Sequence, residues 1–150
     1  MAQGLTNGFT EKQLALYSSQ YYERADLVFR FGALLTLSRE GGERLTEEVY
    51  RALLQDFSQV KSSTSPVVLL MALAWKAFNK IKTQKFHEWN LPILQSIKAL
   101  GVEQRAALYA IDIAGLEVGE AANLFSSSDA AVRQMLAEAQ RYLAVNAIRV

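Results

Sequence analysis

The sequence predicts an all-α protein made of two small helical modules, the second of them a helix-turn-helix. Two observations support this fold class. Hydrophobic residues make up 51% of the 150 positions while only two prolines occur, and a chain rich in Ala and Leu but poor in Pro favours helix over sheet. The apolar positions also recur at helical spacing along most of the chain. A chain of this length has room for one compact domain or two small ones.

The first module, residues 10–85, begins with a capped helix. Thr10 opens the sequence T-E-K-Q, in which Thr10 can cap the helix and Gln13 can bond back to it. The helical repeat that follows fits one long helix or two short ones, and we expect it to end at Gly41-Gly42. A second amphipathic stretch, with glutamates on its outward face, comes next.

The last helix of this module starts at Ser65-Pro66, after a serine-rich stretch over 58–65 that predicts a loop. Ser is a good N-cap, and Pro is tolerated at the first helical position. The helix is apolar on all sides up to Trp75, so we expect its first half to be central to the core.

The second module, residues 90–145, follows a joint over 83–90. A helix restarts at Pro92 and is expected to stop at Gly101. Three short helices come next, and the last two are separated by a turn at Phe125–Ser128. Helices of this length with such a turn fit a helix-turn-helix, although a plain helical bundle fits the spacing equally well.

Several blocks of the sequence resemble extracytoplasmic-function sigma factors. The stretch Leu100–Phe125 carries E-Q-R-x-x-L, D-I-x-G-L and E-A-A-x-L in the order and register of that family's promoter-binding domain, and A-V-R follows at Ala131–Arg133. Glu43–Leu53 resembles the acidic helix that sigma factors dock on the polymerase clamp. Ala77–Lys82 resembles the end of the helix that reads the upstream promoter element. Sigma-like domains of anti-anti-sigma stress regulators are similar too.

This resemblance implies two kinds of binding residue. The polymerase-binding positions are Glu43, Glu47 and Glu48, and the DNA-binding positions are Lys80, Lys82, Lys85, Arg133, Gln134 and Arg141. Plainer interpretations stay open for both charged groups. The glutamates fit a solvated helix face equally well, and the lysines fit a helix end that is favoured by the helix dipole.

The charge of the second module argues against strong DNA binding. From Leu91 to the C-terminus five basic residues (Lys98, Arg105, Arg133, Arg141 and Arg149) face six acidic ones (Glu103, Asp112, Glu117, Glu120, Asp129 and Glu138), a net charge of −1. Because phosphate neutralisation supplies most non-specific affinity, we expect weak DNA binding. Phe125 also stands where the family usually has Gly. A bulky residue would be strained at a position that needs a positive φ, so we expect a changed turn geometry there.

The joint is short for a protein that must span two promoter elements. Fully extended, residues 83–90 reach about 26–29 Å, whereas one turn of DNA measures about 34–36 Å. We therefore expect the two modules to stay packed together.

The composition excludes several other functions. With no cysteine, disulfides, zinc knuckles and thiol catalysis are ruled out. The single histidine, His87, has no partner acidic pair or Gly-rich phosphate loop, so we expect no enzyme, metal site or cofactor. The start of the chain lacks the pattern of a secretory signal, and the longest apolar run, Val67–Trp75, is too short to span a bilayer. We expect a soluble, cytoplasmic protein with no membrane or small-molecule partner.

The sequence thus favours a sigma-like regulator of transcription initiation that acts mainly by protein contacts with an anti-sigma factor or RNA polymerase. A divergent but working sigma factor, which binds core polymerase and promoter DNA, is the alternative. A third possibility is a helical dimer that uses exposed aromatic residues, for which the candidates are Tyr17, Tyr21, Tyr22, Phe86 and Trp89.

Overall fold

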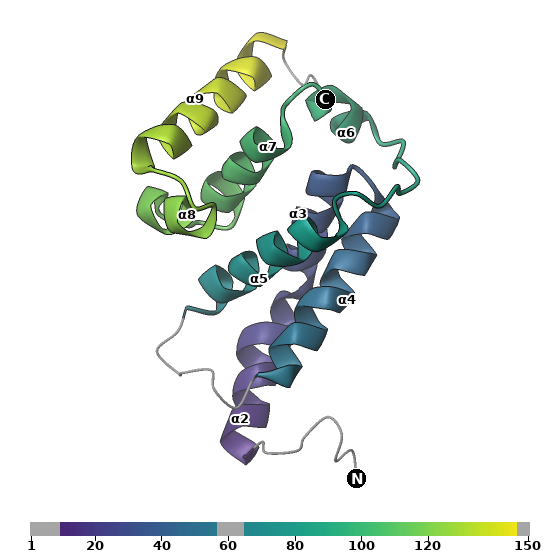
Figure 1. Cartoon of the computed structure of the whole chain (residues 1–150), viewed down its shortest axis with the longest axis vertical. Coiled ribbons are helices and arrows are strands. Elements are labelled where there is room, and N and C mark those ends of the chain that lie inside the picture. Colours follow the sequence, from purple (N-terminus) through teal and green to yellow (C-terminus); the bar gives the residue numbers. More distant parts are fainter. Residues whose placement is uncertain (1–9, 57–64, 147–150) are drawn as a thin grey trace.

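The computed structural model describes residues 10–56 and 65–146 (Figure 1). In these two ranges every regular element is a helix, so the predicted all-α class is confirmed. The elements are α2 (Glu11–Leu16), a π-helical turn (Tyr17–Tyr21), a 3-10 turn (Tyr22–Arg24), α3 (Ala25–Thr36), α4 (Arg39–Gln55), α5 (Pro66–Ile81), α6 (Pro92–Ile97), α7 (Val102–Leu108), a second π-helical turn (Tyr109–Ile113), α8 (Val118–Leu124) and α9 (Asp129–Asn146). Apart from Ser65, the serine-rich stretch expected to form a loop lies outside the described residues.

Three of the side-chain caps that begin helices are those that the sequence predicts. Thr10 Oγ1 accepts the Gln13 backbone N–H at 3.1 Å, and Gln13 Oε1 accepts the Thr10 N–H at 2.9 Å. Ser65 Oγ accepts the Val68 N–H at 3.4 Å, with Pro66 in the first helical turn. Ser128 Oγ caps α9 by accepting the Ala131 N–H at 3.1 Å. Each cap satisfies a backbone donor that has no partner inside its helix.

The predicted break at Gly41-Gly42 is wrong. The chain turns earlier, at Leu37, whose φ of 54° lies in the left-handed region, and Ser38 then caps α4 by accepting the Gly41 N–H at 3.2 Å. Both glycines lie buried inside α4. A Cβ on Gly42 would lie 2.9 Å from the carbonyl oxygen of Phe29, so the missing side chain lets α4 pack closely on α3.

Two further expectations need correction. Gly101 does not stop α6, which ends at Ile97; it precedes α7 with φ −63°, and its N–H bonds to Gln104 Oε1 at 3.0 Å. The first half of α5 is only partly central to the core. Leu70 and Met71 are buried, whereas the first turn from Pro66 to Leu69 is only partly covered.

A shared core joins the N-terminal half (α2–α5) to the C-terminal half (α6–α9). Its buried residues come from both halves and include Phe31, Leu70, Ala106 and Val132. A smaller cluster of Leu94, Ile97, Leu100 and Ala139 packs against Leu34 and Leu37 at the α3–α4 corner. The expectation that the two parts of the chain stay packed together is therefore confirmed.

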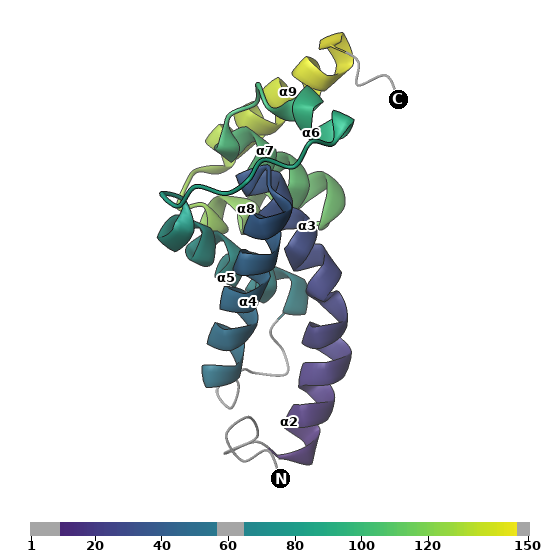
Figure 2. The same cartoon turned by 90° about the vertical axis from the view of Figure 1, so that its right-hand side faces the viewer.

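The molecule is elongated, with α2 at one end and α6 and α9 at the other (Figure 1 and Figure 2). In both views α5 and α7 lie between these ends. No helix within the described ranges is both long and apolar enough to cross a membrane.

Candidate functional site

The pair of helices α8 and α9 is joined by residues 125–128. Phe125 has an ordinary φ of −91°, and the left-handed conformation falls on Ser126 instead, with φ 52°. Phe125 itself therefore carries no strain of this kind. The Phe125 ring packs edge-on against Trp75 of α5, with 4.8 Å between ring centroids, so this bulky side chain fastens the turn to the N-terminal half.

The outward face of α9 carries the three predicted DNA-binding residues of this half. Arg133, Gln134 and Arg141 are exposed, while Val132 and Ala139 on the other side of α9 are buried. Position 141 lies seven residues after position 134, so both side chains project from one side of the helix. The structure thus brings these three residues to one exposed helix surface.

Other basic residues of the C-terminal half are already engaged. Arg105 is only 7% exposed and donates three hydrogen bonds to backbone carbonyl oxygens, from Nε to Leu34 at 2.9 Å, from Nη1 to Leu100 at 2.6 Å and from Nη2 to Leu35 at 3.0 Å. Burial lowers the pKa of Arg105. Lys98 Nζ pairs with Glu88 Oε1 at 3.0 Å. Among the described residues of this half, only Arg133 and Arg141 keep a basic group available for an external anion.

The predicted lysines of the N-terminal half are exposed, and two of them line different hollows. Lys80 lines a hollow between α4 and α5, where Glu48 and Asp56 also lie. Lys82 lines a different hollow, beside Phe86 and Arg105. Lys85 is exposed in the segment that leads to α6.

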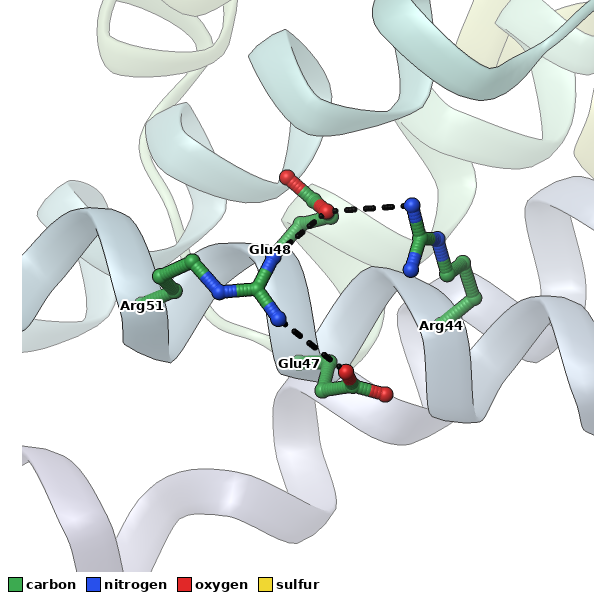
Figure 3. A network of polar contacts seen from close by, with 4 residues as sticks. All are labelled: Arg44, Glu47, Glu48 and Arg51. Atoms are coloured by element: carbon green, nitrogen blue, oxygen red, sulfur yellow. Dashed lines mark hydrogen bonds and ion pairs between the residues drawn. The ribbon is translucent and has the colours of Figure 1, made fainter.

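The predicted polymerase-binding face of α4 is largely neutralised within the helix itself (Figure 3). Arg51 pairs with Glu47 at 3.1 Å and with Glu48 at 3.0 Å, and Arg44 pairs with Glu48 at 3.4 Å. Such pairs, three or four residues apart, add modest stability to the helix. Glu43 is exposed and takes part in none of these pairs, so it is the carboxylate of this set most available to a partner.

The aromatic candidates for a dimer surface are only partly exposed. Tyr21 is buried, and Tyr50 donates its hydroxyl hydrogen to the Tyr21 carbonyl oxygen at 2.6 Å. Trp89 is half-buried, edge-on to Phe29 with 6.2 Å between centroids. Phe86 is likewise half-buried, Tyr17 lies stacked near Tyr22, and Tyr22 itself is 63% exposed.

The residues that join the two halves were not singled out in the sequence analysis. Besides Arg105, the hydroxyl of Tyr109 donates to the Leu27 carbonyl oxygen at 2.7 Å, its ring stacks on Phe31 at 5.2 Å, and burial raises the pKa of Tyr109 to about 12. One signal was present in the sequence. Arg105 and Tyr109 are four residues apart, so a helix places both on the same face.

The described residues hold no group of three or more His, Asp or Glu side chains arranged to bind a metal ion. His87 is exposed between α5 and α6, and its backbone N–H donates to Glu40 Oε1 at 3.1 Å. This hydrogen bond attaches the segment to the start of α4.

Comparison with solved structures identifies the fold. No protein-family model matches the chain, and no curated protein sequence matches it. The sigma factor RpoE in complex with the anti-sigma factor NepR from Bartonella quintana is similar, with a TM-score of 0.73 and 11% identity over 89% of this chain and 98% of that one. The PhyRSL–NepR complex from Sphingomonas sp. Fr1 is similar as well, with a TM-score of 0.70 and 17% identity over 100% of this chain and 93% of that one. The chain therefore has a sigma-factor-like fold.

Proposed function

We propose that this protein is a cytoplasmic, sigma-factor-like regulator of transcription initiation that acts by binding an anti-sigma factor. The observation that carries the proposal is the small number of available cations on α9, in a fold for which two similar solved structures are complexes with the anti-sigma factor NepR. In this proposal residues 10–85 correspond to the polymerase-binding module of a sigma factor and residues 90–145 to its promoter-binding module.

The distribution of charge supports protein binding over DNA binding. A DNA-binding surface gains affinity by placing Lys and Arg on phosphates. Here α9 offers Arg133 and Arg141, while Arg105 is turned inward onto backbone carbonyls. Exposed alanines at 130 and 137 occupy the same outward region of α9. A surface of this composition is better suited to contact with another protein.

A divergent sigma factor that binds core RNA polymerase and promoter DNA is the second candidate. Two observations favour it: Glu43 is exposed on α4, and Lys82 and Lys85 are exposed after α5. In that case the DNA-binding residues are Lys80, Lys82, Lys85, Arg133, Gln134 and Arg141, and the polymerase contacts are Glu43, Glu47 and Glu48.

Titration of the purified protein against each anti-sigma factor of its host tests the proposal by calorimetry. We expect a one-to-one complex with one of them at micromolar or lower Kd. The double variant R133A/R141A is the matched control, because it removes the available arginines of α9 without touching the core. It is expected to bind the anti-sigma factor within about twofold of the parent, since exposed charges contribute little to affinity.

A parallel assay adds the protein to core polymerase and measures run-off transcription. Transcripts that depend on Arg133 and Arg141, together with no binding to any anti-sigma factor, would overturn the proposal in favour of the divergent sigma factor.

A further inference from the structure

The corner between α3 and α4 is the place where the C-terminal half is attached. The carbonyl oxygens of Leu34 and Leu35 accept hydrogen bonds from Arg105. Two residues further along the chain, the Leu37 carbonyl oxygen accepts the Trp89 backbone N–H at 2.9 Å. Within four residues of chain, three carbonyls of the N-terminal half are therefore bonded to groups that follow α5.

Arg105 suits this position for an electrostatic reason. Leu34 and Leu35 belong to the last turn of α3, whose carbonyls have no partner further along the helix. The negative end of the helix dipole lies at the same turn and favours a cation. No ion pair of the described residues involves Arg105, so these carbonyls take the place of a carboxylate.

The same corner carries backbone strain that the C-terminal half holds in place. Leu37 adopts φ 54°, a conformation that Gly usually takes after a helix. Its side chain packs against the cluster of Leu94, Ile97, Leu100 and Ala139. Strained conformations persist where the surrounding structure fixes them, so separation of the two halves would remove the packing that holds Leu37.

We propose that Arg105 is a latch that sets the equilibrium between this closed arrangement and an open one in which the two halves separate. With the latch engaged, α9 is held close to the N-terminal half and a partner meets both halves as one body. Release of the latch frees the segment between α5 and α6 to act as a tether and exposes the Arg105 guanidinium. The inference stands on the contacts of Arg105 and holds for either candidate function.

Distance measurements between two spin labels test the latch. The chain contains no cysteine, so single cysteines at the exposed positions Ala72 in α5 and Ala137 in α9 can be labelled selectively. Pulsed electron paramagnetic resonance on the doubly labelled parent should give one narrow distribution of the distance between the two labels. Arg105→Met should add a broad, longer component and raise the ratio of open to closed molecules by about tenfold or more, because buried carbonyls lose their donors. Arg133→Met is the matched control and should leave the distribution unchanged.

The helical content of each variant, measured by far-ultraviolet circular dichroism, separates opening from unfolding. A folded Arg105→Met protein with the parent's distance distribution would overturn the latch. If that variant does not fold, Arg105→Lys decides, since an ammonium group cannot reproduce the planar set of donors. An open component in folded Arg105→Lys supports the latch. An unchanged distribution contradicts it, and so does loss of helix in both variants, because Arg105 would then be needed for folding itself.

Discussion

Ser126 holds the turn between α8 and α9 in a left-handed backbone conformation, with φ 52°. This conformation costs an L-residue about 1 kcal/mol of conformational free energy, a cost that Gly does not have. Since Ser126 is exposed, we expect Ser126→Gly to stabilise the protein by about 0.5–1 kcal/mol, which raises Tm by about 1–4 °C. Thermal unfolding followed by circular dichroism measures the change.

The neighbouring Ser127 provides the matched control. It is also exposed, and its φ is not positive, so Ser127→Gly adds freedom to the unfolded chain without relieving strain and should lower Tm. Equal losses of Tm in both variants would show that the conformation of Ser126 is not strained.

At the scale of single residues, the sequence predicts what depends on near neighbours. The caps at Thr10, Ser65 and Ser128 follow from side chains that bond to backbone three residues away, and all three are found. Arg105 shows the limit. From the sequence alone Arg105 is indistinguishable from a charged surface residue, because its partners at Leu34 and Leu35 are about seventy positions away. Tertiary contacts of that kind leave no local pattern.

The close approach of α3 and α4 depends on Gly42. An added Cβ would lie 2.9 Å from the Phe29 carbonyl oxygen and 3.1 Å from the Ala33 nitrogen. Both of these are backbone atoms, so neither can rotate away. We expect Gly42→Ala to destabilise the protein by about 1–3 kcal/mol through overpacking, although Ala is the better helix former by about 1 kcal/mol. Urea unfolding measures the free energy change.

Gly119 in α8 is the matched control for this substitution. It is exposed, and an added Cβ would meet nothing within 4 Å. Gly119→Ala should therefore stabilise the protein by about 0.5–1 kcal/mol through helix propensity alone. A stabilising Gly42→Ala would contradict the close packing of α3 on α4.

The misplaced helix break has the same physical origin. Gly-Gly predicts a helix end because local propensity disfavours it inside a helix. In this fold the loss of propensity is offset by the contact between α3 and α4, which only a residue without a side chain allows. The sequence shows the glycine pair but does not show that α3 packs against it. The pair therefore predicts a helix break, whereas in the structure it allows the two helices to pack closely. The true break, at Leu37, carries no breaker residue at all.

At the scale of the whole molecule, the sequence predicts the helical class and the close packing of both parts of the chain. The resemblance in short blocks agrees with the sigma-factor-like fold found by structural comparison. The binding surfaces are less predictable. Residues implied by the resemblance are distributed over α4, the end of α5 and α9, and ion pairs with Arg44 and Arg51 neutralise Glu47 and Glu48. Which charges remain available depends on pairing within the fold.

The scarcity of available cations on α9 can be reversed by design. Ala137→Lys with Ala144→Lys places two lysines at exposed positions of α9. Each new phosphate contact should steepen the slope of log affinity against log salt by about 0.9, so we expect a tenfold or greater gain in affinity for a short duplex, measured by fluorescence anisotropy at several salt concentrations. Ala15→Lys with Ser18→Lys adds the same charge at exposed positions near α2 and should not change the slope. A parent protein that already binds duplex DNA at micromolar concentration with a steep slope would contradict this account of α9.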